Sequence, residues 1–343
     1  MRSRKILINA TAWHTGGGRT LLNGFIKGLA QATENVTIFI DARFEPVPKF
    51  SDNIEFVKVS RLKRFFIDFT INAQAKSNDL VIYVGNLPPV LRFTTKNVLL
   101  ILSSRFFVDN VSFRGFGFKL TMQILLEKIY YNTFLHNVSG IIVQTSTMRR
   151  LLKKSGFQKD IFVWPFDDIG EDASVFPTES NKEPSSFIYV ASLLPYKNHK
   201  RLLLAWKNLK NAGIDVKLYL TLDQDNKIAR WMKNFVTANE LNVTLLVNLK
   251  RQELIKYYQK TEALIYPSFF EAYGLPLIEA KKFKLKILAS DIDYCWDFIT
   301  PDEFFNPYDV DSITRSVKRY LNIPENKDRI YTPREFVDNL KIS

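Results

Sequence analysis

Short apolar runs that alternate with helix-like segments constrain the fold of this 343-residue chain more than any other feature. Runs such as residues 80–84 and 98–102 are apolar throughout, which is typical of parallel strands buried on both faces. The segments between such runs carry apolar residues at helical spacing, as residues 19–30 do. Strands that alternate with helices in this way predict an α/β fold with doubly wound parallel sheets of the Rossmann-like type.

The alternation occurs in two series, each long enough for one domain. In the first series, the predicted strands are residues 5–10, 36–40, 54–59, 80–84, 98–102 and 140–144, and the predicted helices are residues 19–30, 118–136 and 146–154. In the second series, the predicted strands are residues 187–191, 216–222, 243–247, 263–266 and 286–289, and the predicted helices are residues 200–211, 227–239, 251–259, one that opens at Pro276, and 310–321.

A polar segment, residues 165–186, separates the two series. It is acidic and bears prolines, which is typical of a linker. A chain of this length is also long for one hydrophobic core and sufficient for two. We therefore predict an N-terminal Rossmann-like domain at residues 1–170, a C-terminal one at residues 171–325, and a short tail at residues 326–343.

The net charge of +13 lies almost entirely in the first half. Residues 1–170 carry 23 Lys and Arg against 12 Asp and Glu, whereas the remainder carries 25 against 23. A basic domain indicates an anionic partner, such as nucleic acid or anionic lipid, or only a need for solubility. The single cysteine, Cys295, excludes an intramolecular disulfide, and we find neither a signal peptide nor a membrane-spanning apolar run, so we expect a cytoplasmic protein.

The segment from Pro267 to Ala280 carries the most specific pattern in the chain. It follows a buried-strand pattern and opens a helix at its second proline, a residue suited to the first helical position because it has no N–H to satisfy. The free N–H groups of Gly274 and Leu275, with the positive end of the helix dipole, form an anion site. Glu271 and Glu279 frame this turn. Amides for an anion and carboxylates for hydroxyls suit a phosphorylated sugar.

The string Phe-Phe-Glu-Ala-Tyr-Gly-Leu-Pro-Leu-Ile-Glu-Ala in this segment resembles the signature of retaining glycosyltransferases with the two-domain GT-B architecture, the large group 1 class called family 4. The resemblance implies two Rossmann-like domains that face an interdomain cleft, with the C-terminal tail packing back on the first domain. It also implies that Glu271 faces the hydroxyls of a donor sugar and Glu279 those of a ribose. Tyr273, Gly274 and Leu275 would then lie beside the donor.

A second candidate site follows the first predicted strand of the C-terminal domain, where open α/β sheets bind their ligands. The family carries Gly-Arg-Leu-x-x-x-Lys at this place, and its arginine and lysine neutralise the leaving nucleoside diphosphate. Lys197 falls on the lysine, but Ser192 falls on the arginine, so one of the two cations is missing. By this resemblance Lys197 and Glu271 are the predicted catalytic residues. Without the central motif, Lys197 would be read as a solvated lysine at a helix start.

Three glycines, Gly16, Gly17 and Gly18, follow the first predicted strand and predict a tight loop over residues 15–18 that can approach a phosphate closely. The string lacks the third spaced glycine of a dinucleotide fingerprint. The family carries a glycine-rich loop here, so Gly17 and Gly18 are predicted donor contacts and Arg19 a predicted acceptor contact. His14, beside the loop, is either a polar residue of the site or a packed imidazole.

Two segments of the first domain interleave cations with aromatic residues, at residues 61–66 and 106–119. They predict contact with an anionic membrane surface, unless the aromatic residues belong to the core. Arg105, where many relatives carry an acceptor-side histidine, is either an anion binder or a plain loop cation. Asp291 and Asp293 have the spacing of a metal motif but lie late in the second domain, where a loop role is expected. We therefore predict neither a metal nor a cofactor.

Together, these features predict a retaining hexosyltransferase that moves a sugar from a nucleotide-sugar donor to a glycan or lipid-linked acceptor. Bacterial surface polysaccharide synthesis, of lipopolysaccharide O-antigen or capsule, is the expected setting, at the inner face of the membrane. The sequence determines neither the donor, nor the acceptor, nor the oligomeric state. One alternative is a basic nucleic-acid-binding protein, which leaves the Glu271 and Glu279 string unexplained, so we expect no nucleic-acid partner. Another is a GT-B epimerase or phosphorylase.

Overall fold

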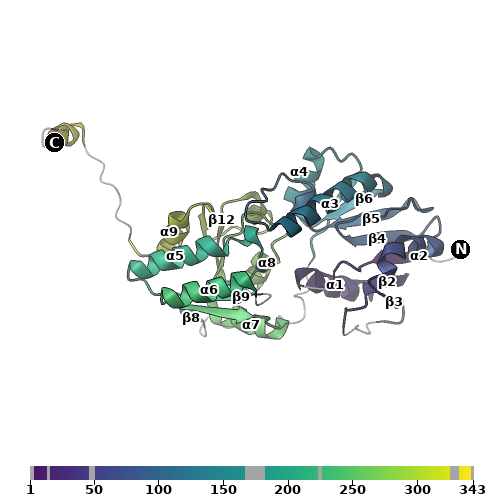
Figure 1. Cartoon of the computed structure of the whole chain (residues 1–343), viewed down its shortest axis with the longest axis horizontal. Coiled ribbons are helices and arrows are strands. Elements are labelled where there is room, and N and C mark those ends of the chain that lie inside the picture. Colours follow the sequence, from purple (N-terminus) through teal and green to yellow (C-terminus); the bar gives the residue numbers. More distant parts are fainter. Residues whose placement is uncertain are drawn as a thin grey trace.

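The computed structural model describes residues 4–13, 16–45, 51–166, 182–222, 226–324 and 332–340. It contains two separate parallel sheets, one for each predicted domain, and helices pack against both (Figure 1). The last strand of the first sheet ends at Val163, just before the predicted linker of residues 165–186, and the first strand of the second begins at Glu183, within the last residues of that segment. The expected architecture of two Rossmann-like domains is therefore confirmed.

The N-terminal sheet has the order β3-β2-β1-β4-β5-β6-β7, and all its neighbouring strands are parallel. Its strands are β1 (Lys5–Asn9), β2 (Asn35–Asp41), β3 (Ile54–Val59), β4 (Leu80–Gly85), β5 (Val98–Leu102), β6 (Gly140–Val143) and β7 (Asp160–Val163). Its helices are α1 (Gly16–Leu29), α2 (Ile67–Gln74), α3 (Phe118–Phe134) and α4 (Ser146–Lys154), with short 3-10 turns η1 (Lys63–Phe66), η2 (Arg105–Phe107) and η3 (Leu135–Asn137). The strand order reverses between β1 and β4, which creates a topological switch point.

The strands of this sheet are buried on both faces. On one face, Leu22 of α1 packs in a cluster with Ile8 of β1. On the other face, Ile71 of α2 and Leu152 of α4 pack in a second cluster with Leu7. All of these side chains are fully buried, and such burial contributes about 1.5–3 kcal/mol for each. Covering both faces is why the strands are continuous apolar runs.

The C-terminal sheet has the order β10-β9-β8-β11-β12-β13, again with parallel neighbours, and its switch point lies between β8 and β11. Its strands are β8 (Glu183–Tyr189), β9 (Lys217–Leu222), β10 (Val243–Val247), β11 (Thr261–Tyr266), β12 (Lys286–Ser290) and β13 (Glu303–Phe305). Its helices are α5 (His199–Asn211), α6 (Lys227–Ala238), α7 (Arg251–Lys260), α8 (Leu275–Lys282) and α9 (Val310–Tyr320), with 3-10 turns η6 (Pro195–Lys197) and η7 (Asp293–Asp297).

The first helix begins earlier than the sequence predicts. The tight glycine loop expected at residues 15–18 is wrong, because Gly16, Gly17 and Gly18 form the first turn of α1. A side chain at Gly18 would meet the ring of Trp13, since an added Cβ would lie 3.0 Å from Trp13 Cδ1. Close packing, not a positive φ, therefore favours glycine at this position.

The C-terminal helix α10 (Pro333–Leu340) lies at the end of the molecule away from the N-terminal domain (Figure 1). Packing of residues 326–343 against that domain, which the family resemblance implies, is not seen in the described part of the tail. Phe336, Val337 and Leu340 are mostly exposed, so the apolar side of α10 is left uncovered by the described residues. Within the described parts of the chain, no helix has the length and apolar character needed to cross a bilayer.

Candidate functional site

A cavity of about 1060 Å³ lies between the two domains. Its wall includes residues at the carboxyl ends of β5, β6, β8 and β11. This is the edge at which open α/β sheets bind ligands. All of the predicted donor contacts line it, namely Gly17, Gly18, Ser192, Lys197, Glu271, Tyr273, Gly274, Leu275 and Glu279. Arg19 and Arg105 line it as well, whereas His14 lies outside the described residues. Positions that are far apart in the sequence are therefore brought to one hollow.

The turn before α8 presents the main-chain donors that the motif predicts. Gly274 caps the helix in the left-handed conformation (φ +74°), and the helix begins at Leu275, so Pro276 is its second residue and not its first. No acceptor is found within the described residues for the N–H groups of Gly274 and Leu275. On the opposite side, an added Cβ at Gly17 would lie 3.6 Å from Leu275 Cδ1. The N-termini of α1 and α8 thus meet across the cavity, and both favour an anion there.

Lys197 and Glu271 form a buried ion pair at this turn. Lys197 Nζ lies 2.6 Å from Glu271 Oε1, and their side chains are only 12% and 9% exposed. Tyr266 also donates its hydroxyl to Glu271 Oε1 at 3.0 Å. Burial lowers the pKa of Lys197, but the carboxylate of Glu271 and the hydroxyl of Tyr196 raise it more, so the net shift of the Lys197 pKa is upward. Lys197 is therefore protonated, and the carboxylate of Glu271 balances its charge.

Glu279 is held in a different way from Glu271. Its Oε1 accepts from Arg251 Nη1 at 2.5 Å, and its Oε2 accepts from the Tyr258 hydroxyl at 2.6 Å. Burial, with the nearby Glu279 carboxylate, raises the pKa of Tyr258 well above its ordinary range, so the phenol stays protonated and remains a donor. Glu279 consequently fixes Arg251 at the wall of the cavity, where this cation lies with Lys197.

A second cation, Arg251, lines the cavity, although the arginine of the family pattern is missing at Ser192. Ser192 lines the cavity in the loop after β8 but carries no charge. Arg251, the first residue of α7, lines the same cavity and is paired with Glu279. Among the described residues there is no group of three or more His, Cys, Asp or Glu side chains that would hold a metal ion.

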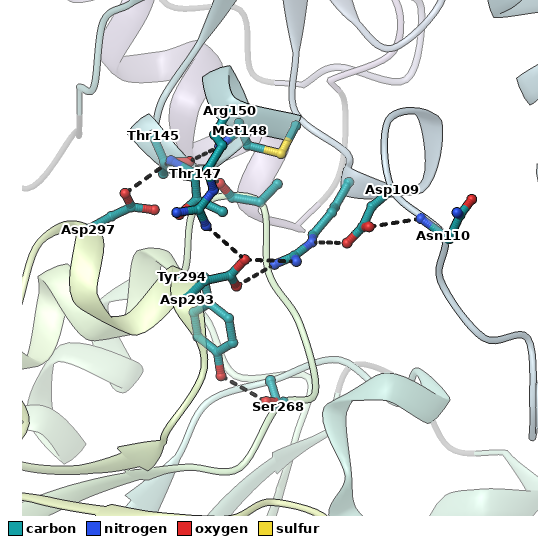
Figure 2. A network of polar contacts seen from close by, with 12 residues as sticks. Asp109, Asn110, Thr145, Thr147, Met148, Arg150, Ser268, Asp293, Tyr294 and Asp297 are labelled. Carbon is teal, nitrogen blue, oxygen red and sulfur yellow. Dashed lines mark hydrogen bonds and ion pairs between the residues drawn. The ribbon is translucent and has the colours of Figure 1, made fainter. Parts of the chain in front are cut away.

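The two domains are joined by a charged network beside the cavity (Figure 2). Arg105 donates from both terminal nitrogens to Asp293 of the other domain at 2.7 and 3.0 Å, and from Nε to Asp109 at 2.6 Å. Arg150 adds a contact of 3.3 Å to Asp293. Burial lowers the pKa of Arg105, but Asp293 and Asp109 raise it more. Because two carboxylates already balance Arg105, its acceptor-side role stays a prediction, and Asp293 has the structural role expected for its loop.

Hydrogen bonds extend this interface around α4 and the motif loop (Figure 2). Asp297 of the C-terminal domain accepts from the Thr147 N–H in the first turn of α4 at 3.1 Å. Thr145, the cap of α4, donates to the Ala272 carbonyl at 3.3 Å. Tyr273 donates its hydroxyl to the Phe166 carbonyl at 2.8 Å. The hydroxyl of Tyr273, a predicted donor contact, is thus used between the domains.

Aromatic rings close one side of the cleft. Phe106, Phe113 and Phe116 of the N-terminal domain pack with Tyr196 and Phe270 of the C-terminal domain, and we call these five residues the aromatic cluster. The rings of Tyr196 and Phe270 stack with centroids 4.4 Å apart, and the Phe106 ring meets Phe270 edge-on at 5.2 Å. The membrane contact expected for residues 106–119 is therefore wrong for these three phenylalanines, which pack between the domains.

Sequence reasoning did not identify two polar residues of this site, Gln144 and Arg251. Each lies after the end of a strand and lines the cavity. A polar residue shortly after an apolar run was therefore the sequence feature that could have identified them. Arg19 was identified, but its guanidinium donates to the Glu45 carbonyl at 2.5 Å and lies 5.2 Å from the Phe44 ring centroid. The structure therefore gives Arg19 local partners, and its contact with an acceptor stays a prediction.

The second half of the chain matches a known family. Residues 171–333 match the model described as Glycosyl transferases group 1, and this region contains the Lys197 and Glu271 pair and the α8 turn. This part of the chain is therefore similar to that family. The resemblance drawn from the motif is confirmed there by an independent comparison.

Curated relatives of the chain include two O-antigen or serotype-specific enzymes. A segment of 109 residues is 34% identical to the serotype-specific mannosyltransferase WbdA of Escherichia coli, and it covers 31% of this chain and 13% of that protein. A longer segment of 229 residues is 26% identical to the O-antigen chain mannosyltransferase RfbU of Salmonella typhimurium, and it covers 63% of this chain and 62% of that protein. The chain thus spans less than two thirds of each of these relatives.

Solved structures show the fold over nearly the whole chain. The sucrose-phosphate synthase of Thermosynechococcus elongatus superposes with a TM-score of 0.72 and 17% identity, over 93% of this chain and 90% of that one. At this identity the likeness supports the architecture alone. The two-domain GT-B fold is therefore shown for both halves, including the N-terminal domain outside the family match.

Proposed function

We propose that this protein transfers a sugar from a nucleotide-sugar donor to a glycan or lipid-linked acceptor, with retention of the anomeric configuration. The observation that carries the proposal is the Lys197 and Glu271 ion pair in a cavity that also receives the free N-terminus of α8. A nucleotide sugar brings two phosphates and several hydroxyls to such a site. The site offers cations and main-chain N–H donors to the phosphates, and carboxylates to the hydroxyls.

The chemistry follows from these groups. Lys197 and the N-terminus of α8 would stabilise the negative charge that develops on the leaving diphosphate, and such fixed charges act strongly where water is excluded. Arg251 adds a second cation to the same wall. Glu271, released from Lys197 by the phosphate, would accept a hydrogen bond from a hydroxyl of the donor sugar and orient it. The bond from the anomeric carbon to phosphate oxygen breaks, and the bond to the acceptor oxygen forms on the same face. The leaving phosphate takes the acceptor proton.

The relatives supply the donor part of the proposal. Both WbdA and RfbU carry the name mannosyltransferase, so we propose an activated mannose as the sugar that is moved. Their serotype-specific and O-antigen names favour bacterial surface polysaccharide synthesis as the setting. A hexosyl donor of this kind has the vicinal hydroxyls that Glu271 would bind.

Thermal unfolding with a panel of donors tests this function. GDP-mannose, UDP-glucose and UDP-N-acetylglucosamine are added separately, and we expect GDP-mannose to raise the melting temperature most, because a ligand at 100 times its Kd stabilises by about 2.7 kcal/mol. Lys197→Met should lose the shift. Lys200→Met is the matched control, since Lys200 is an exposed lysine of α5. A wild-type protein that responds to no donor would overturn the proposal, and a filter-binding titration would then test the nucleic-acid alternative.

The proposal includes a reaction that needs no divalent cation. Lys197, Arg251 and the helix N-terminus would supply the positive charge that a metal ion gives in other transferases. We expect transfer to be unchanged in excess EDTA. Activity that disappears in EDTA and returns with Mg²⁺ would contradict this part.

A lipid-linked acceptor requires the enzyme to reach a membrane, and one surface of the N-terminal domain is suited to that task. Helix α3 exposes an apolar stripe at helical spacing, and η1 with the start of α2 exposes a second one. We call these residues the apolar surface: Leu62, Phe65, Phe66, Phe69, Phe118, Met122, Leu125, Leu126 and Ile129. The two helices cover the same face of the N-terminal sheet, since Ile71 of α2 and Tyr131 of α3 belong to one hydrophobic cluster.

The charge around this surface fits an anionic membrane. Arg61 and Lys63 are exposed beside the first stripe, and Lys119 is exposed beside the second. Basic and aromatic residues on one face favour the headgroup region of anionic lipids. We therefore propose peripheral attachment through the apolar surface to the inner face of the cell membrane.

Vesicle co-sedimentation tests this attachment. We expect recovery with vesicles containing phosphatidylglycerol and little with pure phosphatidylcholine, and we expect Leu126→Glu to reduce it severalfold. Phe304→Glu is the control, because Phe304 is a half-exposed apolar residue of the other domain. Equal recovery with both vesicle types would overturn the attachment. An elution volume that shifts from dimer to monomer in Leu126→Glu would assign the surface to a second copy instead.

A further inference from the structure

Gln144 is a buried amide without a partner at the wall of the interdomain cavity. It directly follows β6 and is 1% exposed. Among the described residues, neither its Oε1 nor its Nε2 has a hydrogen-bond partner. Leaving buried polar atoms unpaired costs about 1–3 kcal/mol for each group, so an orphaned side chain is uncommon and calls for an explanation.

The position of Gln144 distinguishes it from the other unpaired groups. Buried side-chain atoms without partners also occur on seven further residues of the described structure, among them Tyr131, His199 and Thr261. Of this set, only Gln144 lines the cavity that holds Lys197 and Glu271. An amide that lacks a partner in the empty site, and borders the place where substrate would lie, is suited to pair with substrate.

The neighbours of Gln144 hold it against the motif loop. The next residue, Thr145, accepts from the Met148 N–H as the cap of α4 and donates to the Ala272 carbonyl at 3.3 Å. Ala272 follows Glu271 directly. The backbone at Gln144 is therefore fixed near the loop that carries Glu271. A turn about the last dihedral angle of its side chain, which is a broad torsion in Gln, would direct the amide toward a ligand.

We propose that Gln144 binds a pair of adjacent hydroxyls on the sugar that is transferred. A carboxamide accepts through its oxygen and donates through its nitrogen, and a vicinal diol offers one hydroxyl to each. This contact comes from the N-terminal domain, whereas Lys197, Glu271 and the α8 turn belong to the C-terminal domain. Gln144 would thus contact the sugar and not the nucleotide. The inference rests on the proposed function, because it takes a nucleotide sugar as the ligand.

Calorimetric titration separates the sugar contact from the nucleotide contact. Wild type and Gln144→Leu are titrated with GDP-mannose and with GDP, or with the donor of the panel that the wild type binds and its free nucleoside diphosphate. We expect Gln144→Leu to bind the nucleotide sugar about tenfold more weakly, because two neutral hydrogen bonds are lost, and the nucleoside diphosphate with unchanged affinity. Gln123→Leu is the control, since Gln123 is exposed on α3.

Thermal unfolding of the Gln144 variants distinguishes a lost sugar contact from a loss of folding. Leucine removes the unpaired amide, so Gln144→Leu should unfold at the same temperature as wild type or a higher one. Gln144→Asn, which withdraws the amide by one methylene group, should show an intermediate affinity and serves if the leucine variant does not fold. Equal affinity of wild type and the Gln144 variants for the nucleotide sugar would overturn this inference and leave the proposed function intact. Absence of binding by the wild type to every donor would overturn both.

Discussion

At the scale of single residues, Lys197 and Glu271 each depend on the other for their charge to be tolerated in a nearly buried position. Removing one member of such a pair leaves an uncompensated buried charge, which costs about 3–5 kcal/mol. We predict that Lys197→Met loses about 3 kcal/mol of unfolding free energy as well as activity. The double variant Lys197→Met with Glu271→Gln should recover most of the stability but no activity. Urea unfolding of the two variants checks this, and an unstable double variant would speak against the pairing.

His199, the first residue of α5, makes stability depend on pH. Burial, together with the charge of Lys197, lowers its pKa to about 3, and its Nε2 has no hydrogen-bond partner in the described part of the chain. The unfolded chain has the ordinary value of about 6.5, so it binds a proton first as the pH falls, and stability is lost below that value. We predict that His199 accounts for about 2 kcal/mol of the loss between pH 7.5 and pH 5.0. The loss should shrink by that amount in His199→Gln, and urea midpoints at the two pH values measure it.

The residues of the site differ in how far the sequence predicts them. Lys197, Glu271 and Gly274 belong to local patterns that a strand end and a helix start make recognisable. Arg251 and Gln144 come from other strand ends, and only the closed arrangement of two domains brings them to the same cavity. No local pattern carries that information. The absence of the family arginine at Ser192 is visible in the sequence, whereas the position of Arg251 at the same cavity is not.

At the scale of elements, the turn into α8 depends on glycine. Gly274 has φ +74°, and an added Cβ would lie 3.2 Å from Leu277 Cδ1. We predict that Gly274→Ala destabilises the protein by about 1–2 kcal/mol, because an L-residue is strained in that conformation. Gly28→Ala in α1 is the matched control. Nothing lies within 4 Å of its added Cβ, so it should instead stabilise by about 0.5–1 kcal/mol. Thermal unfolding of both variants tests the pair, and equal shifts would contradict the strain.

The helices and strands also differ in how well the sequence predicts them. Helix α4 was predicted at its observed bounds, because its apolar spacing and its threonine cap agree. Strands β7 and β13 and helix α2 were not predicted, since each is short and its apolar pattern covers few residues. β7 and β13 are outermost strands of their sheets, where less burial is needed. Their assignment depends on pairing with a neighbour that is distant in sequence.

At the scale of the whole molecule, Asp293 links the domains by accepting from both Arg105 and Arg150. We predict that Asp293→Asn weakens this contact, so that the ligand-free protein samples more open arrangements and its radius of gyration increases in X-ray scattering. Asp215→Asn serves as the control, because Asp215 pairs with Lys210 at 3.7 Å within one domain. Scattering curves that are identical for wild type and Asp293→Asn would show that this network does not hold the domains together.

The aromatic cluster affects how the contact between the two domains depends on ionic strength. Dissolved salt screens charges, so the carboxylates and guanidinium groups between the domains attract each other less as ionic strength increases. Contacts between rings do not depend on charge, and salting-out ions strengthen them. The two kinds of contact respond to salt in opposite directions. We therefore expect the contact between the domains to depend less on ionic strength than a contact made by charged groups alone.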